Sequence, residues 1–322
     1  MTRLIAFGEA LVDMLSSRLG SSTAQETFTP YAGGAPANVA VACARLGVPS
    51  QFIGMLGRDR FGDFILEELA SHGVDVRHVA RTLEAKTALA FVSRDASGER
   101  RFDFYRPPSA DLLYRPEHLP EGLFDGSSIL HLCSNTLTEE AITATTITVA
   151  DKAAAAGALV SVDANLRANL WPDHLVDRVR VNSLLDRAQL IKLSREELEL
   201  LRGAESEERY LQARLAAGAV LVVITDGGEP VTAVTARTRL RVKPPSVQVV
   251  DTTAAGDAFI GGLISALVDA KVSRGTLASW AQEEGRLREA LEFATRCGAF
   301  TVTRPGSYAA LPKREDLSSL RG

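Results

Sequence analysis

The sequence predicts an α/β protein: a doubly wound, mainly parallel sheet flanked by helices, with a small β-rich lid. Three observations support this fold class. Short β-branched and apolar runs alternate with longer helical segments along the 322 residues. Several of these runs are apolar almost throughout, which is typical of strands buried on both faces of a parallel sheet. Two further β-type segments have no helix attached and break the alternation.

The strands expected in the main sheet are the short apolar runs. They cover residues 3–9, 50–57, 127–134, 159–165, 188–194 and 219–228. Helical segments separate them, and the helices at 36–47 and 60–73 end at Gly47 and Gly73, because glycine suits the left-handed residue that closes many helices. Parallel strands joined through helices require right-handed crossovers, so these elements should form one body.

After these strands, the pattern predicts an antiparallel sheet edge followed by helices. Two period-two segments, 231–238 and 238–246, are expected at that edge. Residues 258–270 and 288–303 are helical by the spacing of their apolar residues. The segment between them, 272–285, is expected to be a surface excursion.

The lid is expected to come from two separate insertions. Residues 86–106 contain two alternating segments joined by a turn with Ser97 and Gly98, which is the pattern of a β-hairpin. An extended stretch at 26–33 lies between the first strand and the first helix. The predicted boundaries are 1–14, 33–85 and 112–322 for the body, and 15–32 and 86–111 for the lid.

Composition and charge exclude several classes of protein. The net charge is −4 and no block of Lys and Arg is present, so we expect no nucleic-acid partner. The N-terminal apolar stretch contains an acid, unlike a signal peptide, and no later run is long and apolar enough to span a membrane. The three cysteines, Cys43, Cys133 and Cys297, are far apart in apolar surroundings, which predicts buried free thiols and a cytoplasmic protein.

Residues 251–262, DTTAAGDAFIGG, contain the first candidate for chemistry. If a helix begins at Ala255 or Gly256, the backbone N–H groups of residues 254–257 converge on one point, with the positive end of the helix dipole behind them. Small side chains leave room there for a phosphate. Asp257 could then take a proton from a hydroxyl that attacks the phosphate. The alternative is an acid that only stabilises a helix N-terminus.

A second candidate is the glycine-rich stretch 31–47, YAGGAPANVAVACARLG. Gly33 and Gly34 allow a hinge between lid and body, and Asn38 would face a ligand from the first turn of the next helix. Asp13, expected at the end of the first strand, could accept two hydroxyl hydrogen bonds from a sugar. The alternatives are a turn without a ligand and a solvated loop residue. No phosphate-binding P-loop and no dinucleotide fingerprint are present.

Together, these two glycine-containing stretches resemble the N-terminal and C-terminal signatures of the ribokinase-like (PfkB-type) carbohydrate kinases. The resemblance extends from residues 3–13 to residues 303–312, which is essentially the whole chain. Within that family the sequence is most similar to fructokinases. The segments that carry this likeness are FYRPPSADLLY at 104–114, VSVDANLRANLWPD at 160–173 and IKLSREELELL at 191–201.

The resemblance implies ATP-dependent phosphorylation of a hydroxyl of fructose, with Asp257 as the base and the backbone at Ala254, Ala255 and Gly256 as an anion hole. It implies sugar or phosphate contacts for Asp13, Gly33, Gly34, Asn38, Phe104, Arg106 and Arg167. It assigns Lys192, Ser194, Thr225, Gly227 and Cys297 to the nucleotide. It assigns Glu197 to Mg²⁺ through water, and Asp251 and Thr253 to a monovalent cation such as K⁺.

Three positions depart from the family pattern. Ala254 stands where most members have glycine, which preserves the backbone N–H provided that the residue does not need a positive φ. Ser194 replaces the asparagine of an N-x-x-E motif, so a part for its side chain in organising the metal does not follow from the resemblance. Asp226 stands where an apolar residue is usual, so the affinity for adenine could differ.

Two alternatives stay open at this point. A 2-keto-3-deoxygluconate kinase would need cations for the substrate carboxylate, and Arg106 with Arg167 could supply them. The second alternative is a non-catalytic sugar-binding relative that kept the fold. The sequence also predicts a homodimer through the lid, because Phe91, Phe102 and Phe104 could pack across such a contact.

Overall fold

The computed structural model describes residues 2–20, 25–94 and 100–320. Its main sheet has eight strands in the order β14-β13-β12-β11-β10-β9-β1-β4. Six of them, from β4 to β12 in this order, are parallel, and β13 and β14 form an antiparallel edge, as the pattern predicts. The strands are β1 Arg3–Phe7, β4 Ser50–Ile53, β9 Ser128–Cys133, β10 Leu159–Asp163, β11 Leu190–Ser194, β12 Leu221–Asp226, β13 Glu229–Val234 and β14 Arg239–Val242.

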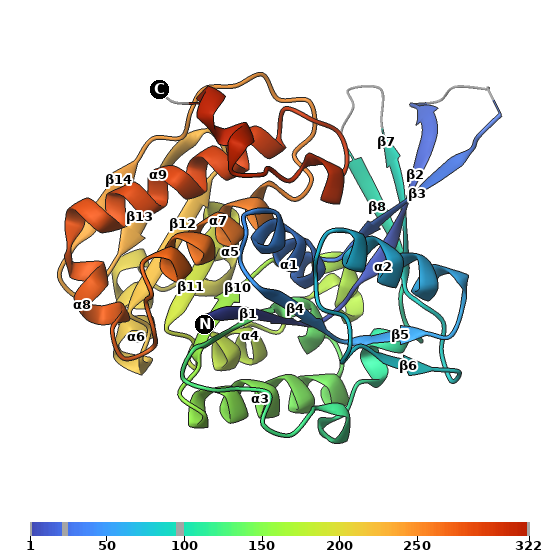
Figure 1. The fold of residues 1–322 in the computed structure, drawn as a ribbon, viewed down its shortest axis with the longest axis horizontal. Coiled ribbons are helices and arrows are strands. Elements are labelled where there is room, and N and C mark those ends of the chain that lie inside the picture. Colours follow the sequence, from blue (N-terminus) through green and yellow to red (C-terminus); the bar gives the residue numbers. More distant parts are fainter. Residues whose placement is uncertain (1, 21–24, 95–99, 321–322) are drawn as a thin grey trace.

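Helices cover both faces of this sheet (Figure 1). Alternate side chains of one strand point to opposite faces, so Leu4 packs with one group of helices and Ile5 with the other. The first group is α1 Ala35–Arg45, α7 Ala255–Asp269, α8 Leu277–Gln282 and α9 Glu284–Thr301. The second is α3 Glu140–Ala155, α4 Arg178–Leu185, α5 Arg195–Arg202 and α6 Glu207–Ala217. The doubly wound arrangement is therefore confirmed.

Two parts of the body differ from the sequence-based prediction. Segment 272–285 is not a plain surface excursion, because it contains α8 with Leu277, Trp280 and Ala281 buried against the core. Their i, i+3, i+4 spacing forms one apolar helix face. A small subdomain also lies beside β4, formed by β5 Met55–Gly57, α2 Arg60–Ser71 and β6 Ala80–Thr82.

In the described part of the chain, every helix is too short or too polar to cross a membrane.

The lid is a separate sheet of four strands in the order β3-β2-β7-β8, set to one side of the body (Figure 1). Its strands are β2 Leu11–Leu19, β3 Phe28–Gly33, β7 Leu89–Arg94 and β8 Arg100–Tyr105. The predicted turn at Ser97 and Gly98 lies outside the described residues. The two insertions join because β2 pairs in parallel with β7.

Asp13 belongs to this lid and not to the end of the first body strand. The first strand ends at Phe7, and the chain leaves the main sheet at Gly8, where a Cβ atom would lie 2.6 Å from Pro36 Cγ. A new strand, β2, starts at Leu11 and carries Asp13. The apolar N-terminal stretch thus contains two strands, β1 and β2, that belong to different sheets. Its sequence pattern alone does not separate them.

Candidate active site

A pocket of about 940 Å³ lies between the lid and the body. It is bounded by the carboxyl ends of the parallel strands, where ligands bind in open α/β sheets. The lid contributes one face of its sheet, with Leu11, Asp13, Leu15, Phe102 and Phe104 lining the cavity. The starts of helices α1 and α7 form part of the opposite wall.

Helix α7 begins at Ala255, so the expected helix start is confirmed. The first intrahelical hydrogen bond runs from Ala258 N–H to Ala254 O at 2.8 Å. The N–H groups of Gly256 and Asp257 precede this bond and belong to the first turn, whose donors have no partner within the helix. The N–H of Ala255 donates to Thr252 O at 3.3 Å. Helix geometry therefore provides a small anion cradle at the floor of the pocket.

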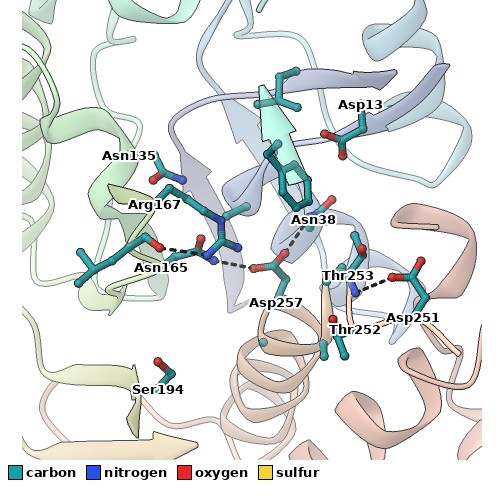
Figure 2. Close-up of a pocket in the computed structure, with 18 of the residues that line it drawn as sticks. Asp13, Asn38, Asn135, Asn165, Arg167, Ser194, Asp251, Thr252, Thr253 and Asp257 are labelled. Atoms are coloured by element: carbon teal, nitrogen blue, oxygen red, sulfur yellow. Dashed lines mark hydrogen bonds between the residues drawn. The ribbon is translucent and has the colours of Figure 1, made fainter. Parts of the chain in front are cut away.

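Asp257 projects from this helix start into the pocket, as Figure 2 shows. Its Oδ2 accepts a hydrogen bond from Asn38 Nδ2 at 2.7 Å, and its Oδ1 accepts one from Asn165 Nδ2 at 3.2 Å. Burial raises the pKa of Asp257 to about 7, although the hydrogen bond from Asn38 acts in the opposite direction. A carboxyl group with this pKa exchanges protons readily at neutral pH, which suits a general base.

The paired glycines before α1 make room for the lid and its carboxylate. A Cβ atom at Gly33 would lie 2.6 Å from Asp13 Oδ2. Gly34 has φ +104°, and a Cβ atom there would lie 2.6 Å from the backbone oxygen of Glu9. Gly34 is therefore required for the chain to pass between lid and body, whereas a side chain at Gly33 would displace the Asp13 carboxylate. Gly34, Asp13 and Asn38 line the pocket.

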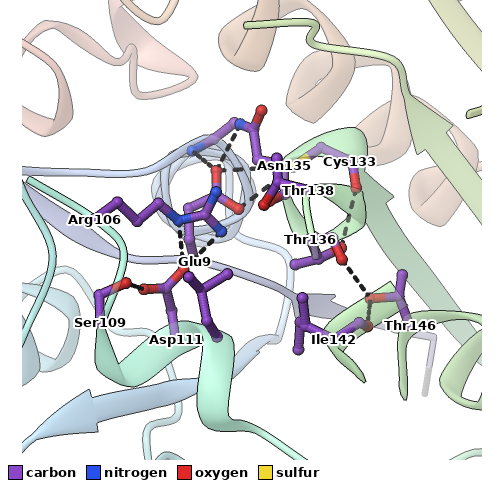
Figure 3. A network of polar contacts seen from close by, with 12 residues as sticks. Glu9, Arg106, Ser109, Asp111, Cys133, Asn135, Thr136, Thr138, Ile142 and Thr146 are labelled. Atoms are coloured by element: carbon purple, nitrogen blue, oxygen red, sulfur yellow. Dashed lines mark hydrogen bonds and ion pairs between the residues drawn. The ribbon is translucent and has the colours of Figure 1, made fainter. Parts of the chain in front are cut away.

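A buried polar network supports the same end of the pocket (Figure 3). Arg106 is 1% exposed and pairs with Asp111 Oδ2 through Nε at 2.7 Å and Nη2 at 2.6 Å. Glu9 Oε1 accepts hydrogen bonds from Asn135 Nδ2 at 2.9 Å and Ala35 N–H at 3.3 Å. Burial raises the pKa of Glu9, and the charge of Arg106 opposes this shift. Arg106 therefore lines the pocket as a clamped, buried cation and not as a mobile lid side chain.

The sequence-based site prediction omits several residues of this centre. Glu9, Asn135 and Asn165 all line the pocket, and none was singled out. Asn165 carries one signal in its position, directly after an apolar strand at the ligand edge of the sheet. The φ of +41° at Asn165, which asparagine tolerates better than most residues, became visible only in the structure.

On the nucleotide side, Lys192, Ser194 and Thr225 line the pocket, but Gly227 and Cys297 are not among its lining residues. Gly227 lies in the turn between β12 and β13. Cys297 is fully buried in α9, where a Cβ atom at Gly262 would lie 2.8 Å from its Sγ. Close packing of α7 against α9 therefore encloses the thiol, and this geometry does not support the predicted adenine contact of Cys297.

Glu197 and Ser194 form a capping box at the start of α5. Glu197 Oε2 accepts from Ser194 N–H at 2.6 Å, and Ser194 Oγ accepts from Glu197 N–H at 3.1 Å. Glu197 Oε1 also accepts from Leu166 N–H at 2.8 Å. Serine and asparagine are both among the best N-cap residues, so the departure from asparagine at this position preserves the helix cap. The carboxylate of Glu197 still lines the pocket.

Asp251 and Arg167 lie on opposite sides of the cradle (Figure 2). Asp251 Oδ1 accepts from Thr253 N–H at 3.0 Å, and Oδ2 accepts from Gly306 N–H at 2.9 Å. These bonds hold the loop that leads into α7. Arg167 is exposed at the pocket wall and donates from Nη1 to its neighbour's carbonyl, Leu166 O, at 3.1 Å. Its guanidinium therefore lies on the open side of the pocket.

Ala254 has the left-handed conformation that the sequence left open, with φ +59° and ψ +10°. An L-residue in this region is strained by roughly 1–2 kcal/mol, whereas glycine is not. We therefore expect Ala254→Gly to raise the free energy of unfolding by about 0.5–1 kcal/mol, after allowing for the greater freedom of glycine in the unfolded chain. Urea unfolding monitored by circular dichroism measures the change.

The neighbouring substitution Ala255→Gly is the matched control, because residue 255 is the first helical residue and has no left-handed φ. There, glycine relieves no strain and should lower the free energy of unfolding by up to about 1 kcal/mol, because glycine is freer in the unfolded chain. Equal losses in both variants would show that residue 254 is not strained.

The geometry, a buried carboxyl group at a helix start beneath a lid, is typical of a class of protein: enzymes that move a phosphoryl group onto a hydroxyl. The chain belongs to the pfkB family of carbohydrate kinases, whose family model matches residues 1–314. The fold and family expected from the two sequence signatures are confirmed.

Known proteins similar to this chain include several fructokinases. Probable fructokinase-4 of Arabidopsis thaliana is 38% identical over 98% of this chain and 96% of its own length. The crystal structure of fructokinase from Xylella fastidiosa with bound ATP is 41% identical, with a TM-score of 0.93 over 99% of this chain and 97% of that chain. Fructokinase from Vibrio cholerae O395 in fructose, ADP and calcium ion bound form is 32% identical, with a TM-score of 0.85 over 99% of both chains.

Proposed function

We propose that this carbohydrate kinase transfers the γ-phosphoryl group of ATP to a hydroxyl of fructose. The observation that carries the proposal is Asp257, a buried carboxyl group with a pKa of about 7 on the first turn of α7. The related structures with bound ATP and with fructose and ADP support both substrates. A non-catalytic relative would have no need to keep an ionisable group buried here, since burial of a carboxylate is costly.

In this mechanism, Asp257 takes the proton of the sugar hydroxyl as the hydroxyl oxygen bonds to the γ-phosphorus. The bond between that phosphorus and the β–γ bridging oxygen breaks, and ADP leaves. The backbone N–H groups at 254–257 stabilise the negative charge of the transferring group. Two of these N–H groups, at Gly256 and Asp257, lie in the open first turn of α7. Positioning and charge stabilisation are the main demands of phosphoryl transfer.

The sugar side of the site comprises the lid and the ends of β1 and β10. Asp13 and Asn38 are the proposed hydroxyl partners, and the backbone at Gly33 and Gly34 allows the lid to approach. Phe104 covers the sugar, while Arg106 and Arg167 donate to sugar oxygens or phosphate. Closure of the lid would exclude water that could otherwise hydrolyse ATP.

The proposed nucleotide side comprises Lys192, Ser194 and Thr225, which line the pocket at the ends of β11 and β12, and Gly227 in the turn after β12. In the described part of the chain, no three His, Cys, Asp or Glu side chains gather to hold a metal ion by themselves. A site with few protein ligands fits Mg²⁺, because this ion keeps several waters and is bound mainly by the phosphates of its substrate. Glu197 would hold one of these waters. When bound, the ion neutralises charge on the β- and γ-phosphates. Asp251 and Thr253 are the proposed contacts of a monovalent cation such as K⁺.

A coupled assay for ADP, run over a panel of sugars with MgATP, tests the proposal. Fructose should give the highest kcat/KM. The alternative substrate, 2-keto-3-deoxygluconate, carries a carboxylate, and Arg106 is already paired with Asp111 in the structure. If the keto-acid sugar is phosphorylated and fructose is not, the assigned substrate is wrong. If sugar binds without ADP formation, the protein is a binding relative and not a kinase.

The pKa of Asp257 predicts the pH dependence of the reaction. The base acts only when deprotonated, so kcat/KM for fructose should rise with pH, with a midpoint near 7, and then level off. The profile is measured at saturating MgATP. A rate that stays constant between about pH 5.5 and about pH 8.5 would contradict the role of Asp257 as base.

We further propose that the protein forms a homodimer through the lid. Phe28, Phe91 and Tyr105 form a row of edge-to-face contacts, with ring centroids 5.1 Å apart in both pairs. This row lies on the lid face opposite Phe102 and Phe104, because successive residues of a strand alternate. The sequence suggested Phe91, Phe102 and Phe104 for this contact. Only Phe91 lies on the same lid face as Phe28 and Tyr105.

We also propose a cytoplasmic location, which a buried set of reduced cysteines favours. Cys43, Cys133 and Cys297 are all free and buried, as predicted. Disulfides are rare in the reducing cytosol, so unpaired thiols suit that compartment.

A further inference from the structure

A buried ion pair lies beside the start of α7. Lys192 in β11 and Asp163 in β10 are register partners in neighbouring parallel strands, so both side chains lie on the same face of the sheet. Lys192 Nζ donates to Asp163 Oδ2 at 3.0 Å, and the side chains are 6% and 1% exposed. Such burial carries a large desolvation cost, so the pair is weak evidence for stability and its position calls for another explanation.

The ammonium group of Lys192 occupies the space beside Gly256. A Cβ atom built on Gly256 would lie 2.9 Å from Lys192 Nζ. Any other residue at 256 would therefore force the ammonium to move. Because the Gly256 N–H belongs to the open first turn of α7, the ammonium lies next to the anion cradle.

Lys192 also has donors to spare for a ligand. An ammonium group has three N–H donors, and Asp163 Oδ2 accepts one from Lys192, which lines the pocket. Burial acts to lower the pKa of Lys192, but the charges of Asp163, Glu197 and Asp257 outweigh burial and raise it. The group therefore stays positively charged at neutral pH.

We propose that Lys192 is a catalytic residue that completes the anion hole, donating from its ammonium group to the phosphoryl group during transfer, with Asp163 as its positioning residue. This inference rests on the proposed kinase function and adds a charged donor to the backbone N–H groups. Lysine binds phosphate as a compact point charge, and a fixed charge in a buried pocket is more effective than one in water. Negative charge on the transferring oxygens is what the ammonium stabilises.

The test compares Lys192→Met, Asp163→Asn and the double variant Lys192→Met/Asp163→Asn with wild type. The double variant removes both charges, so it leaves no unpaired buried carboxylate to disturb folding. We expect Lys192→Met and the double variant to lose about 100- to 1,000-fold in kcat, as for loss of an oxyanion-hole donor. The KM for fructose should change less than about threefold, because the lost contact is made in transfer. Asp163→Asn keeps the ammonium and should lose less.

A binding measurement distinguishes transfer from simple nucleotide affinity. Calorimetry with ADP alone, and with ADP, fructose and aluminium fluoride as a mimic of the transferring group, should show a much larger loss for the mimic in the double variant. The charge of Lys192 also lowers the pKa of Asp257, so the acidic limb of the kcat/KM profile should move to higher pH in Lys192→Met. Lys152→Met, on the exposed surface of α3, is the matched control and should behave as wild type.

Two results would overturn the role of Lys192. One is a folded double variant with kcat within about threefold of wild type. The other is an equal loss of affinity for ADP and for the aluminium fluoride complex, which would indicate ground-state binding only. A wild-type protein inactive with every sugar would instead refute the proposed function, so the two failures are distinguishable.

Discussion

Asp257→Asn should lower kcat by about 100- to 10,000-fold or more, because asparagine cannot accept the proton of the sugar hydroxyl. The fold should survive the change. Asn38 Oδ1 and Asn165 Oδ1 are both buried and have no hydrogen-bond partner among the described residues, so rotation of either side-chain amide would present an acceptor to the new amide group. The coupled ADP assay with fructose measures the loss.

The same substitution should stabilise the protein. The folded-state pKa of Asp257, about 7, lies above its ordinary value of 3.8, so the folded protein favours the protonated carboxyl. The protonated carboxyl group is compatible with the buried site, so its contribution to the free energy of unfolding is fully present below pH 3.8 and is lost as the pH rises through 7. At pH 8 the ionised group therefore costs roughly 4 kcal/mol, and asparagine avoids most of that cost. We expect a gain of about 2–4 kcal/mol at pH 8 that shrinks by more than half near pH 5.

Asp269→Asn is the matched control for both readouts, since Asp269 lies at the other end of α7 with 54% of its side chain exposed. It pairs with Arg314 at 2.8 Å, and its loss should cost no more than about 1 kcal/mol. It should leave kcat within about twofold of wild type. An Asp257→Asn variant that stays active, or that is less stable than wild type at pH 8, would contradict the site as described.

Asp111→Asn should destabilise the protein by about 3–5 kcal/mol, because it removes the partner of a buried guanidinium. Arg106 is held by Asp111 through two short contacts, and neither side chain is more than 2% exposed. Glu9 would be the remaining carboxylate near this cation, and loss of Asp111 removes a charge that raises the pKa of Glu9. Thermal and urea unfolding measure the loss.

The comparison for this prediction is an exposed ion pair of similar length. Asp151 pairs with Arg187 at 2.8 Å, but its side chain is 55% exposed. Asp151→Asn should change the free energy of unfolding by less than about 1 kcal/mol, because water replaces the lost partner. If the two aspartates gave equal losses, burial of Arg106 would not be the cause.

Much of the fold could be predicted because strand and helix periodicity are local properties of the chain. The apolar runs became the strands of the main sheet, except that the run 50–57 is divided into β4 and β5, and β5 belongs to a separate two-stranded sheet. The expected antiparallel edge is formed by β13 and β14. Errors arose where the local pattern is the same for two environments. The apolar run through Asp13 is extended in both sheets, so nothing local marks the change from body to lid. Segment 272–285 is polar overall, yet three apolar residues bury one helix face.

The site was predictable where a function needs a special backbone as well as a side chain. Gly33, Gly34 and Gly256 are recognisable because a side chain there would meet other atoms: backbone at Gly34, and the ends of Asp13 and Lys192 at the other two positions. Glu9 and Asn135 were missed because buried polar residues have no local pattern that separates them from ordinary surface residues, and the position of Asn165 after a strand is a weak signal by itself. Their partners come from distant parts of the chain, as the 126-residue separation of Glu9 and Asn135 shows.

By itself, the sequence determined the order of strands and helices, the family and the carboxylate in the first turn of α7. Only the tertiary structure decided that this carboxylate titrates near pH 7, since burial sets that value and depends on packing from the whole chain. Its hydrogen-bond partners, Asn38 and Asn165, lie 219 and 92 residues away in sequence. The tertiary structure likewise placed the Lys192 ammonium beside Gly256, because strand register and helix docking meet there.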